Sequence, residues 1–184
     1  MAGRRAGADA LNVARMRALV LLCLLTAAPA AAEVRSATAN GFEVQSVAVV
    51  KASPEAAWAM IVKPAAWWNP EHSWSGKAAN LTIEPRAGGC FCEAVPPGGS
   101  VEHGRVLSAM PGRLLLLEAP LGPLQSLAVT TRLSWRLKPV AGGTEITQTY
   151  VAGGYLPMGG DTLAPAVDGV LAEQLARLKA KLDH

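Results

Sequence analysis

The sequence predicts an α+β domain in which an antiparallel sheet of about seven strands is covered by one long C-terminal helix. Short segments that alternate apolar and polar residues recur along most of the chain, and turns rich in glycine and proline separate them. Such short connections favour antiparallel hairpins over parallel crossover units. The C-terminal stretch instead carries leucine and valine at spacings of three and four, which is typical of an amphipathic helix.

Residues 1–32 have the layout of a secretory signal peptide. Four arginines precede an apolar run at 18–25, and small residues follow it up to Ala32. We expect cleavage after Ala32, with Met16 as an alternative start of the leader. An uncleaved anchor is disfavoured because the apolar run is shorter than the roughly 18 residues of a membrane span. The sequence therefore predicts a periplasmic or secreted protein with no stable membrane span after cleavage.

The charge balance changes once this leader is removed. The whole chain has 17 Lys and Arg residues and 14 Asp and Glu residues. The leader holds four of the basic residues and one of the acidic residues, so 13 of each remain. A formally neutral chain without a block of Lys or Arg is unsuited to following a phosphate backbone, so we expect no nucleic-acid binding.

After a short N-terminal extension at 33–41, residues 42–184 are expected to form a single domain. Residues 42–50 alternate as a first strand, and Ser53 and Pro54 begin a helix that runs to about Val62. This gives one or two short helices after the first strand. Six further strands are predicted at 80–84, 89–94, 101–109, 114–119, 129–137 and 144–151, and the terminal helix at about 163–182, capped by Asp161 or Thr162.

Residues 64–76, here called the tryptophan segment, hold Trp67, Trp68, Trp74 and His72. Tryptophan rings outside regular strands and helices either plug one end of a core or form the rim of a pocket, and core plugs are commoner. Adjacent residues cannot point the same way in a helix or strand. We therefore expect one of Trp67 and Trp68 to anchor the core and the other to face ligand space.

The strand at 89–94 places Cys90 and Cys92 on one face and Phe91 and Glu93 on the other. An oxidising compartment permits a disulfide, although cysteines two apart on a strand lie near the upper limit of Cα separation for such a bond. If the cysteines point inward, they line the interior as small apolar groups. If Phe91 and Glu93 point inward, a buried carboxyl group with a raised pKa becomes a candidate acid or base.

His72 and His103 are the remaining polar candidates, because histidine titrates near neutral pH. The strand that holds His103 has no clean alternation, and a histidine there is more often a hydrogen-bonded structural residue. A metal site made from Cys90, Cys92, His72 and His103 lacks the usual spacing between paired ligands, so we expect no metal and no cofactor. The leucines of the loop at 120–127 either dock a partner or fold back on the core.

The element order and several local motifs resemble the SRPBCC superfamily with its START-like helix-grip fold. The motifs are the strand-to-helix junction at 52–58, the tryptophan segment, Gly88-Gly89 before Phe91, Gly142-Gly143-Thr144 and the leucine-rich terminal helix. The resemblance extends over about residues 42–182 and points to the polyketide-cyclase-like and heat-shock ATPase-activator-like branches. The predicted leader sets this chain apart from the chaperone-activating members, which are cytosolic.

This resemblance implies a curved sheet wrapped around the terminal helix, with an elongated apolar cavity between them. It implies a carrier or binding protein for a small hydrophobic molecule. The alternatives are a cyclase- or hydrolase-type enzyme that uses His72, His103 or Glu93 as acid or base, and a protein-interaction module. The expected ligand-contacting residues are Trp67, Trp68, His72, Trp74, Phe91, His103, Trp135 and Tyr150.

Overall fold

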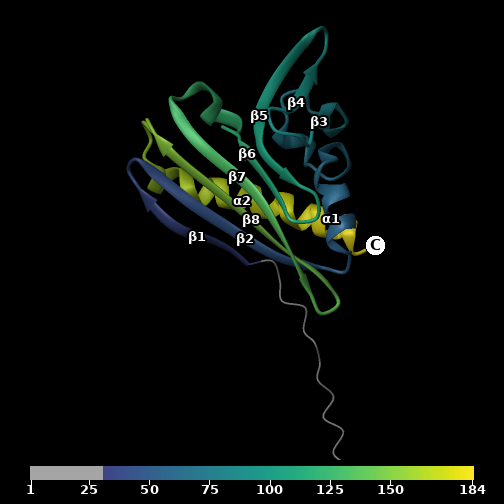
Figure 1. Cartoon of the computed structure of the whole chain (residues 1–184). Coiled ribbons are helices and arrows are strands. Elements are labelled where there is room, and N and C mark those ends of the chain that lie inside the picture. Colours follow the sequence, from purple (N-terminus) through teal and green to yellow (C-terminus); the bar gives the residue numbers. More distant parts are fainter. Residues whose placement is uncertain (1–30) are drawn as a thin grey trace, which may run out of the picture.

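The computed structural model describes residues 31–184, which form an open antiparallel sheet with a long helix lying across it (Figure 1). The sheet has eight strands in the order β1-β2-β8-β7-β6-β5-β4-β3. The strands are β1 (Ala31–Thr38), β2 (Gly41–Val50), β3 (Leu81–Ile83), β4 (Cys90–Val95), β5 (Gly99–Met110), β6 (Leu114–Glu118), β7 (Val129–Val140) and β8 (Gly143–Gly154).

Two α-helices and four 3₁₀ turns complete the domain. The helices are α1 (Pro54–Ile61) and α2 (Gly160–Leu182), and the turns are η1 (Pro64–Ala66), η2 (Pro70–His72), η3 (Ala78–Asn80) and η4 (Gly122–Ser126). Helix α2 packs against β1, β2 and β8, whereas the segment that follows α1 contacts β3 and β4 at the other end of the strand order (Figure 1). The predicted α+β helix-grip fold is confirmed.

The core lies on the face of the sheet that is turned toward α2. Alternating residues of β2 and β7 are buried on this face, among them Val44 and Val50 in β2 and Leu133 and Trp135 in β7. The alternation predicted for 129–137 is therefore confirmed, because strand residues of one parity share a face.

The boundaries of the two helices follow from their capping residues. The Ser53 side chain accepts a hydrogen bond from the Ala56 N–H at 3.3 Å, as an N-cap does, and α1 begins at Pro54. Helix α2 begins earlier than predicted, at Gly160, and neither Asp161 nor Thr162 caps it. A Cβ atom at Gly160 would lie 2.6 Å from the carbonyl oxygen of Gly41, so glycine lets the helix start against the sheet.

Strand β1 was not predicted, and it raises the strand number from about seven to eight. Residues 33–38 were expected to be an extension, but they pair with β2 at the edge of the sheet. Residues 33–40 are exposed, so no buried face leaves an alternating pattern in the sequence. The predicted signal peptide lies outside the described residues except for Ala31 and Ala32, which begin β1.

Strand β5 contains an irregularity that explains its unclear pattern. Phe91 and Cys92 are consecutive in β4 but pair with Gly104 and Glu102 in β5, so His103 is an extra residue in the ladder. A bulge of this kind turns two successive side chains to the same face. His103 and Gly104 are accordingly both buried, and the inward positions change parity at this point.

Candidate functional site

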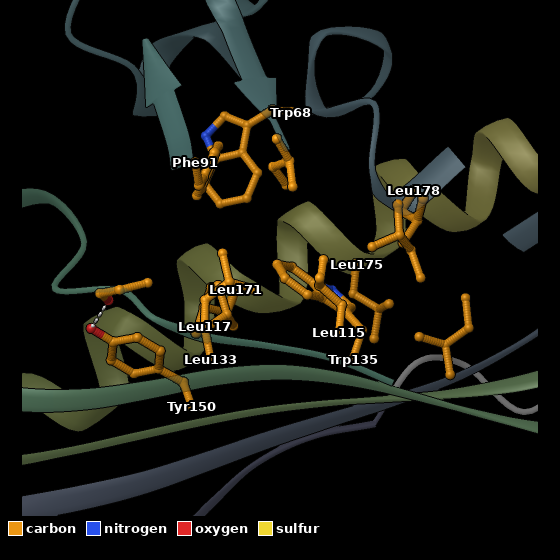
Figure 2. Close-up of a cluster of buried hydrophobic side chains, with 14 of the residues drawn as sticks. Trp68, Phe91, Leu115, Leu117, Leu133, Trp135, Tyr150, Leu171, Leu175 and Leu178 are labelled. Carbon is orange, nitrogen blue, oxygen red and sulfur yellow. Dashed lines mark hydrogen bonds between the residues drawn. The ribbon is translucent and has the colours of Figure 1, made fainter. Parts of the chain in front are cut away.

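Five aromatic side chains form a continuous row inside the domain, here called the aromatic row. Its members are Trp135, Trp67, Trp68, Phe91 and His103, with successive ring centroids 6.2, 5.4, 5.5 and 5.0 Å apart. Each of these residues is at most 4 % exposed. Figure 2 shows Trp68 beside Phe91 at one end of the core and Trp135 deeper among the leucines.

A carboxylate lies at the end of the aromatic row. Glu93 is 1 % exposed, and its Oε2 lies 2.7 Å from Nε2 of His103. The backbone N–H of Trp74 donates to the same oxygen at 3.0 Å, and the N–H of Ser75 donates to Oε1 at 2.6 Å. Glu93 faces inward by the alternation of β4, and the bulge turns His103 toward it. The second of the two predicted orientations, with Phe91 and Glu93 inward, is the one observed.

The pKa of Glu93 differs from the prediction. Burial raises the pKa of this carboxyl group. The hydrogen bonds from Ser75, from the Trp74 N–H and from His103 together lower the pKa by more than burial raises it, so the net pKa lies below the ordinary value. The expectation of a raised pKa is therefore wrong. Donors that stabilise the charged form outweigh the loss of water around it.

The tryptophan segment is fastened to α2 by polar contacts. The Asn69 N–H donates to Oε1 of Gln174 at 2.8 Å, and the Asn69 side-chain amide donates to Oε1 of Glu173 at 2.6 Å. Nε of Arg177 donates to the Trp67 carbonyl at 3.0 Å. These bonds hold the segment between α2 and the β3–β5 end of the sheet.

Trp67 and Trp68 are both buried in this segment. The indole N–H of Trp67 donates to the Met60 carbonyl and that of Trp68 to the His72 carbonyl, each at 2.9 Å. Trp67 contacts Trp135 of β7, whereas Trp68 contacts Phe91 of β4. The two neighbouring rings thus connect the middle of the sheet with the strand that carries Glu93.

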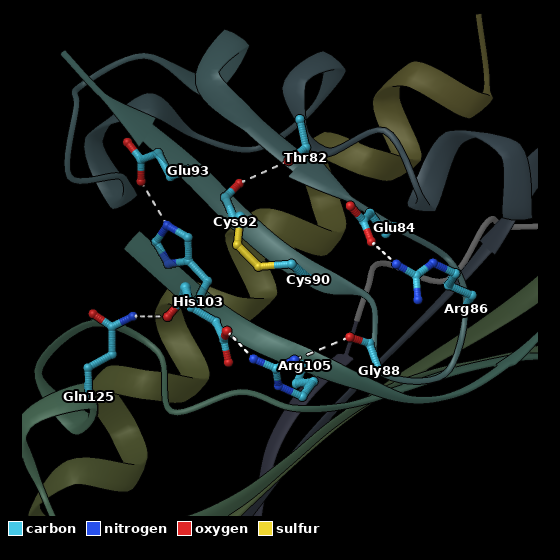
Figure 3. The surroundings of a disulfide bond; sticks show 11 residues. Thr82, Glu84, Arg86, Gly88, Cys90, Cys92, Glu93, His103, Arg105 and Gln125 are labelled. Carbon is cyan, nitrogen blue, oxygen red and sulfur yellow. Dashed lines mark hydrogen bonds and ion pairs between the residues drawn. A yellow bond between two sulfur atoms is a disulfide. The ribbon is translucent and has the colours of Figure 1, made fainter. Parts of the chain in front are cut away.

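Trp74 lies on the surface above the Glu93 pair. It is 59 % exposed, and its indole N–H donates to Oε1 of Gln125 at 3.1 Å. Gln125 in turn donates to the Glu102 carbonyl at 2.8 Å (Figure 3). The loop that carries Gln125 folds back on the core, because Leu124 is 4 % exposed. Gln125 therefore bridges the tryptophan segment and the strand that carries His103.

His72 does not join the Glu93 pair. Its Nε2 lies 3.3 Å from Oε2 of Glu173 on α2, in a partly exposed position. Cys90 and Cys92 form a disulfide with a Cα separation of 5.4 Å, on the face of β4 opposite Glu93 (Figure 3). Within residues 31–184, no group of three or more His, Cys, Asp and Glu side chains is placed to hold a metal ion.

Trp135 and Tyr150 are held by protein partners in the core. The Tyr150 hydroxyl donates to the Ala119 carbonyl at 3.0 Å, and burial raises its pKa to about 12. The side-chain amide of Gln148 satisfies both of its neighbours when its oxygen accepts from the Trp135 indole N–H at 3.1 Å and its nitrogen donates to the Leu171 carbonyl at 2.9 Å. The polar atoms of these residues are thus satisfied within the protein.

The space between the sheet and α2 is filled by side chains in this structure. The aromatic row shares it with leucines of β6, β7 and α2, including Leu115, Leu133 and Leu175 (Figure 2). On the described part of the chain, a hollow of about 440 Å³ lies between residues 62–66 and β3, and one of about 330 Å³ lies on the face of the sheet turned away from α2. Neither hollow is the elongated interior cavity that was expected.

Asn69 and Gln174 were missed by the sequence analysis. Gln174 is 0 % exposed, and its Nε2 has no hydrogen-bond partner among the described residues. The sequence does contain a sign of this buried glutamine, because Gln174 lies three residues after Leu171 and directly before Leu175 in the apolar stripe of α2. A polar residue inside such a stripe usually has a specific buried partner, and here that partner is the backbone of Asn69.

Among residues 31–184, no helix has the length and hydropathy that a membrane crossing requires. No curated protein has a significant sequence match to the chain.

Solved structures share the fold at low sequence identity. A protein from Rhodobacter sphaeroides is 23 % identical, with a TM-score of 0.53, and the match covers 83 % of this chain and 98 % of that one. A protein from Mesorhizobium loti is 19 % identical, with a TM-score of 0.55 and coverages of 77 % and 96 %. The di-domain ARO/CYC StfQ from the steffimycin biosynthetic pathway is 16 % identical, with a TM-score of 0.53 and coverages of 78 % and 51 %.

A family model gives a more specific assignment. The model described as polyketide cyclase / dehydrase and lipid transport matches residues 41–183, which include β2 to β8 and both α-helices. The SRPBCC-type resemblance predicted from the motifs is thereby confirmed. The chain belongs to the polyketide cyclase / dehydrase and lipid transport family.

Proposed function

We propose that this protein binds a small hydrophobic molecule between the sheet and α2, with the Glu93–His103 pair as the polar end of the site. The observation that carries the proposal is the position of this pair. A charged group is expensive to bury in an apolar core, and here one lies at the end of an aromatic row. Membership of a family described as polyketide cyclase / dehydrase and lipid transport supports a hydrophobic ligand.

Binding in this region requires the aromatic row to move, because its rings fill the space. The tryptophan segment is the part that would make room, since it is irregular and, apart from its buried rings, is joined to its surroundings mainly by hydrogen bonds that involve side chains. These bonds include those of Trp67, Asn69 and His72 to α2, of Trp74 to Gln125, and of the Trp74 and Ser75 N–H groups to Glu93. The ligand would enter where this segment meets the loop that carries Gln125.

The proposal places this binding protein in the periplasm or outside the cell. The leader predicted at residues 1–32 is its main support. The Cys90–Cys92 disulfide is in keeping with an oxidising compartment. Detection of a mature chain that begins at Glu33 in the periplasmic fraction would test this location.

Native mass spectrometry of gently purified protein tests the binding function. We expect a co-purified apolar molecule, or saturable uptake of a hydrophobic dye that quenches tryptophan fluorescence. Glu93→Gln should weaken dye binding, whereas Glu102→Gln, on the exposed side of the adjacent strand, should not. A protein that is consistently empty and takes up no dye would contradict the proposal.

An enzymatic function is a second candidate, because Glu93 and His103 meet at 2.7 Å. Both oxygens of Glu93 are occupied by protein donors, so Glu93 would orient His103 and His103 would act as the general base. Hydrolysis of a panel of p-nitrophenyl esters tests this candidate. It predicts activity that is lost in His103→Gln and kept in His72→Gln, and the absence of activity across the panel would count against it.

A further inference from the structure

Three basic side chains surround the hollow on the face of the sheet turned away from α2. Arg136 and Lys138 are two residues apart on the outer face of β7, which separates their Cα atoms by about 7 Å. Arg113 is the last residue of the turn between β5 and β6, and its N–H donates to the Met110 carbonyl at 2.9 Å. All three side chains line one hollow of about 330 Å³. Two separate elements thus bring together cations that are not a block in the sequence.

These three cations have no anionic partner within the described part of the chain. None of their side chains takes part in a hydrogen bond or an ion pair among residues 31–184. Glu145 lies opposite Lys138 in the β7–β8 register but forms no ion pair with it there. With three positive charges and one negative charge, the lining keeps an excess of two positive charges. Neighbouring like charges repel, so the arrangement favours a bound anion.

The rest of the lining is partly apolar. Met110, which is 46 % exposed, and Leu114 form part of the wall, and the Thr147 side chain adds a hydroxyl group. The volume is at the lower end of the range for small-molecule pockets. A phosphate monoester carries a charge of about −1.5 to −2 at neutral pH, which matches the excess positive charge, and arginine forks suit its oxygen atoms.

We propose that this hollow is a binding site for a phosphate monoester group attached to an apolar substituent, with Arg113, Arg136 and Lys138 contacting the phosphate and Met110 and Leu114 contacting the substituent. The site is separate from the interior of the domain. It therefore does not depend on the binding function proposed above. Either a soluble phosphate ester or the phosphate headgroup of a lipid could present this chemistry.

Isothermal titration calorimetry with phenyl phosphate at constant ionic strength tests the site. We expect saturable binding with one molecule per chain, and weaker binding of inorganic phosphate, which lacks the apolar group. Sedimentation with phosphatidylcholine vesicles that contain phosphatidic acid, whose headgroup is a phosphate monoester, or with vesicles of phosphatidylcholine alone distinguishes the two sources. Binding to the anionic vesicles alone would identify a lipid headgroup, whereas binding of phenyl phosphate without vesicle binding would identify a soluble ester.

The double variant Arg136→Gln and Lys138→Gln should lower phenyl phosphate affinity at least about tenfold. Arg132→Gln is the matched control. Arg132 is on the same face of β7 but does not line the hollow, and its guanidinium forms an ion pair with the Glu118 carboxylate at 3.6 Å. Arg113→Gln, in a different element, should also weaken binding, and circular dichroism would verify that each variant is folded. The proposal is overturned if no probe binds saturably, or if the double variant and the control bind equally well.

Discussion

Glu93 shows how one residue can be kept charged inside an apolar core. Its two oxygens accept hydrogen bonds from two backbone N–H groups and from His103. These donors replace the water that burial removes, and they lower the pKa below the ordinary value of 4.5 although burial raises it. The same bonds tie the tryptophan segment to β4, so the carboxylate has a structural consequence as well as a proposed binding role.

Glu93→Gln is expected to lower the free energy of unfolding by about 1–3 kcal/mol at neutral pH, because the amide offers one acceptor oxygen in place of two and leaves a buried donor unsatisfied. The stabilisation by the charged carboxylate is fully present above pH 4.5 and is lost as the pH falls through the lowered folded-state pKa. The difference between wild type and variant should therefore shrink at acidic pH. Urea denaturation at several pH values measures this, with Glu102→Gln as the control, and a difference independent of pH would refute it.

Asp168 on α2 presents the opposite case. Its Oδ1 is buried and has no hydrogen-bond partner among the described residues, and burial together with the negative charge of Glu33 raises its pKa. Because the folded-state pKa lies above the ordinary value of 3.8, the charged form costs stability, and this cost appears as the pH rises above 3.8.

Asp168→Asn should therefore increase the free energy of unfolding at pH 7 by an amount on the order of 1 kcal/mol. Below pH 3.8 the gain should vanish, because the wild-type carboxyl group is then neutral in both states. Denaturant titrations at the two pH values measure the effect. Asp161→Asn, at an exposed position in the first turn of the same helix, should give no gain. A variant that is no more stable than wild type at pH 7 would rule out this account.

At the scale of elements, the strands with one buried face were the ones that the sequence could predict. Strands such as β7 alternate clearly, so their positions follow from periodicity. Strand β1 is held by backbone pairing at the edge and has exposed residues, so it leaves no such pattern. The bulge at His103 interrupts the pattern of β5, because an extra residue shifts the positions that follow it to the other face, and a second irregularity between Val106 and Ser108 shifts them again.

The site was predicted in part for the same reason. Glu93 and His103 were both candidates, but their meeting depends on a bulge and on pairing between two strands, which no local pattern reveals. Asn69 and Gln174 were missed because their contact joins residues 105 positions apart in the chain. Six of the eight residues expected to contact ligand, namely Trp67, Trp68, Phe91, His103, Trp135 and Tyr150, are core residues in this structure.

The attachment of the tryptophan segment to α2 can be tested as a property of that segment. Asn69 caps η2 and also bonds to Glu173, so Asn69→Ala should loosen the segment at a cost of about 0.5–2 kcal/mol. We expect faster hydrogen exchange at the indole N–H groups of Trp67 and Trp68. Ser53→Ala removes a comparable cap from α1 and should leave these two groups unchanged. Equal acceleration in both variants would show that only global stability had changed.

For the whole molecule, the filled interior and the proposed binding function are in competition. Every ring of the aromatic row stabilises the folded protein by burying apolar surface, and the same rings occupy the volume that a ligand needs. A ligand must therefore compensate for the contacts that it displaces. This requirement favours an aromatic or polycyclic ligand, because such a molecule can replace ring contacts with contacts of the same kind.

Trp68→Ala separates the two roles of the aromatic row. The variant should lose about 3–5 kcal/mol of stability, because a large buried ring is removed. It should also bind a small hydrophobic dye more tightly than wild type does, since the ring no longer has to be displaced near Glu93 and His103. Leu178→Ala is the matched control, because it opens space in the same core away from Trp68 (Figure 2). Fluorescence titration of the dye measures the affinity, and thermal unfolding measures the stability. If both variants gain dye affinity equally, any cavity in this core suffices, and the end of the aromatic row beside the Glu93 pair is not the binding site.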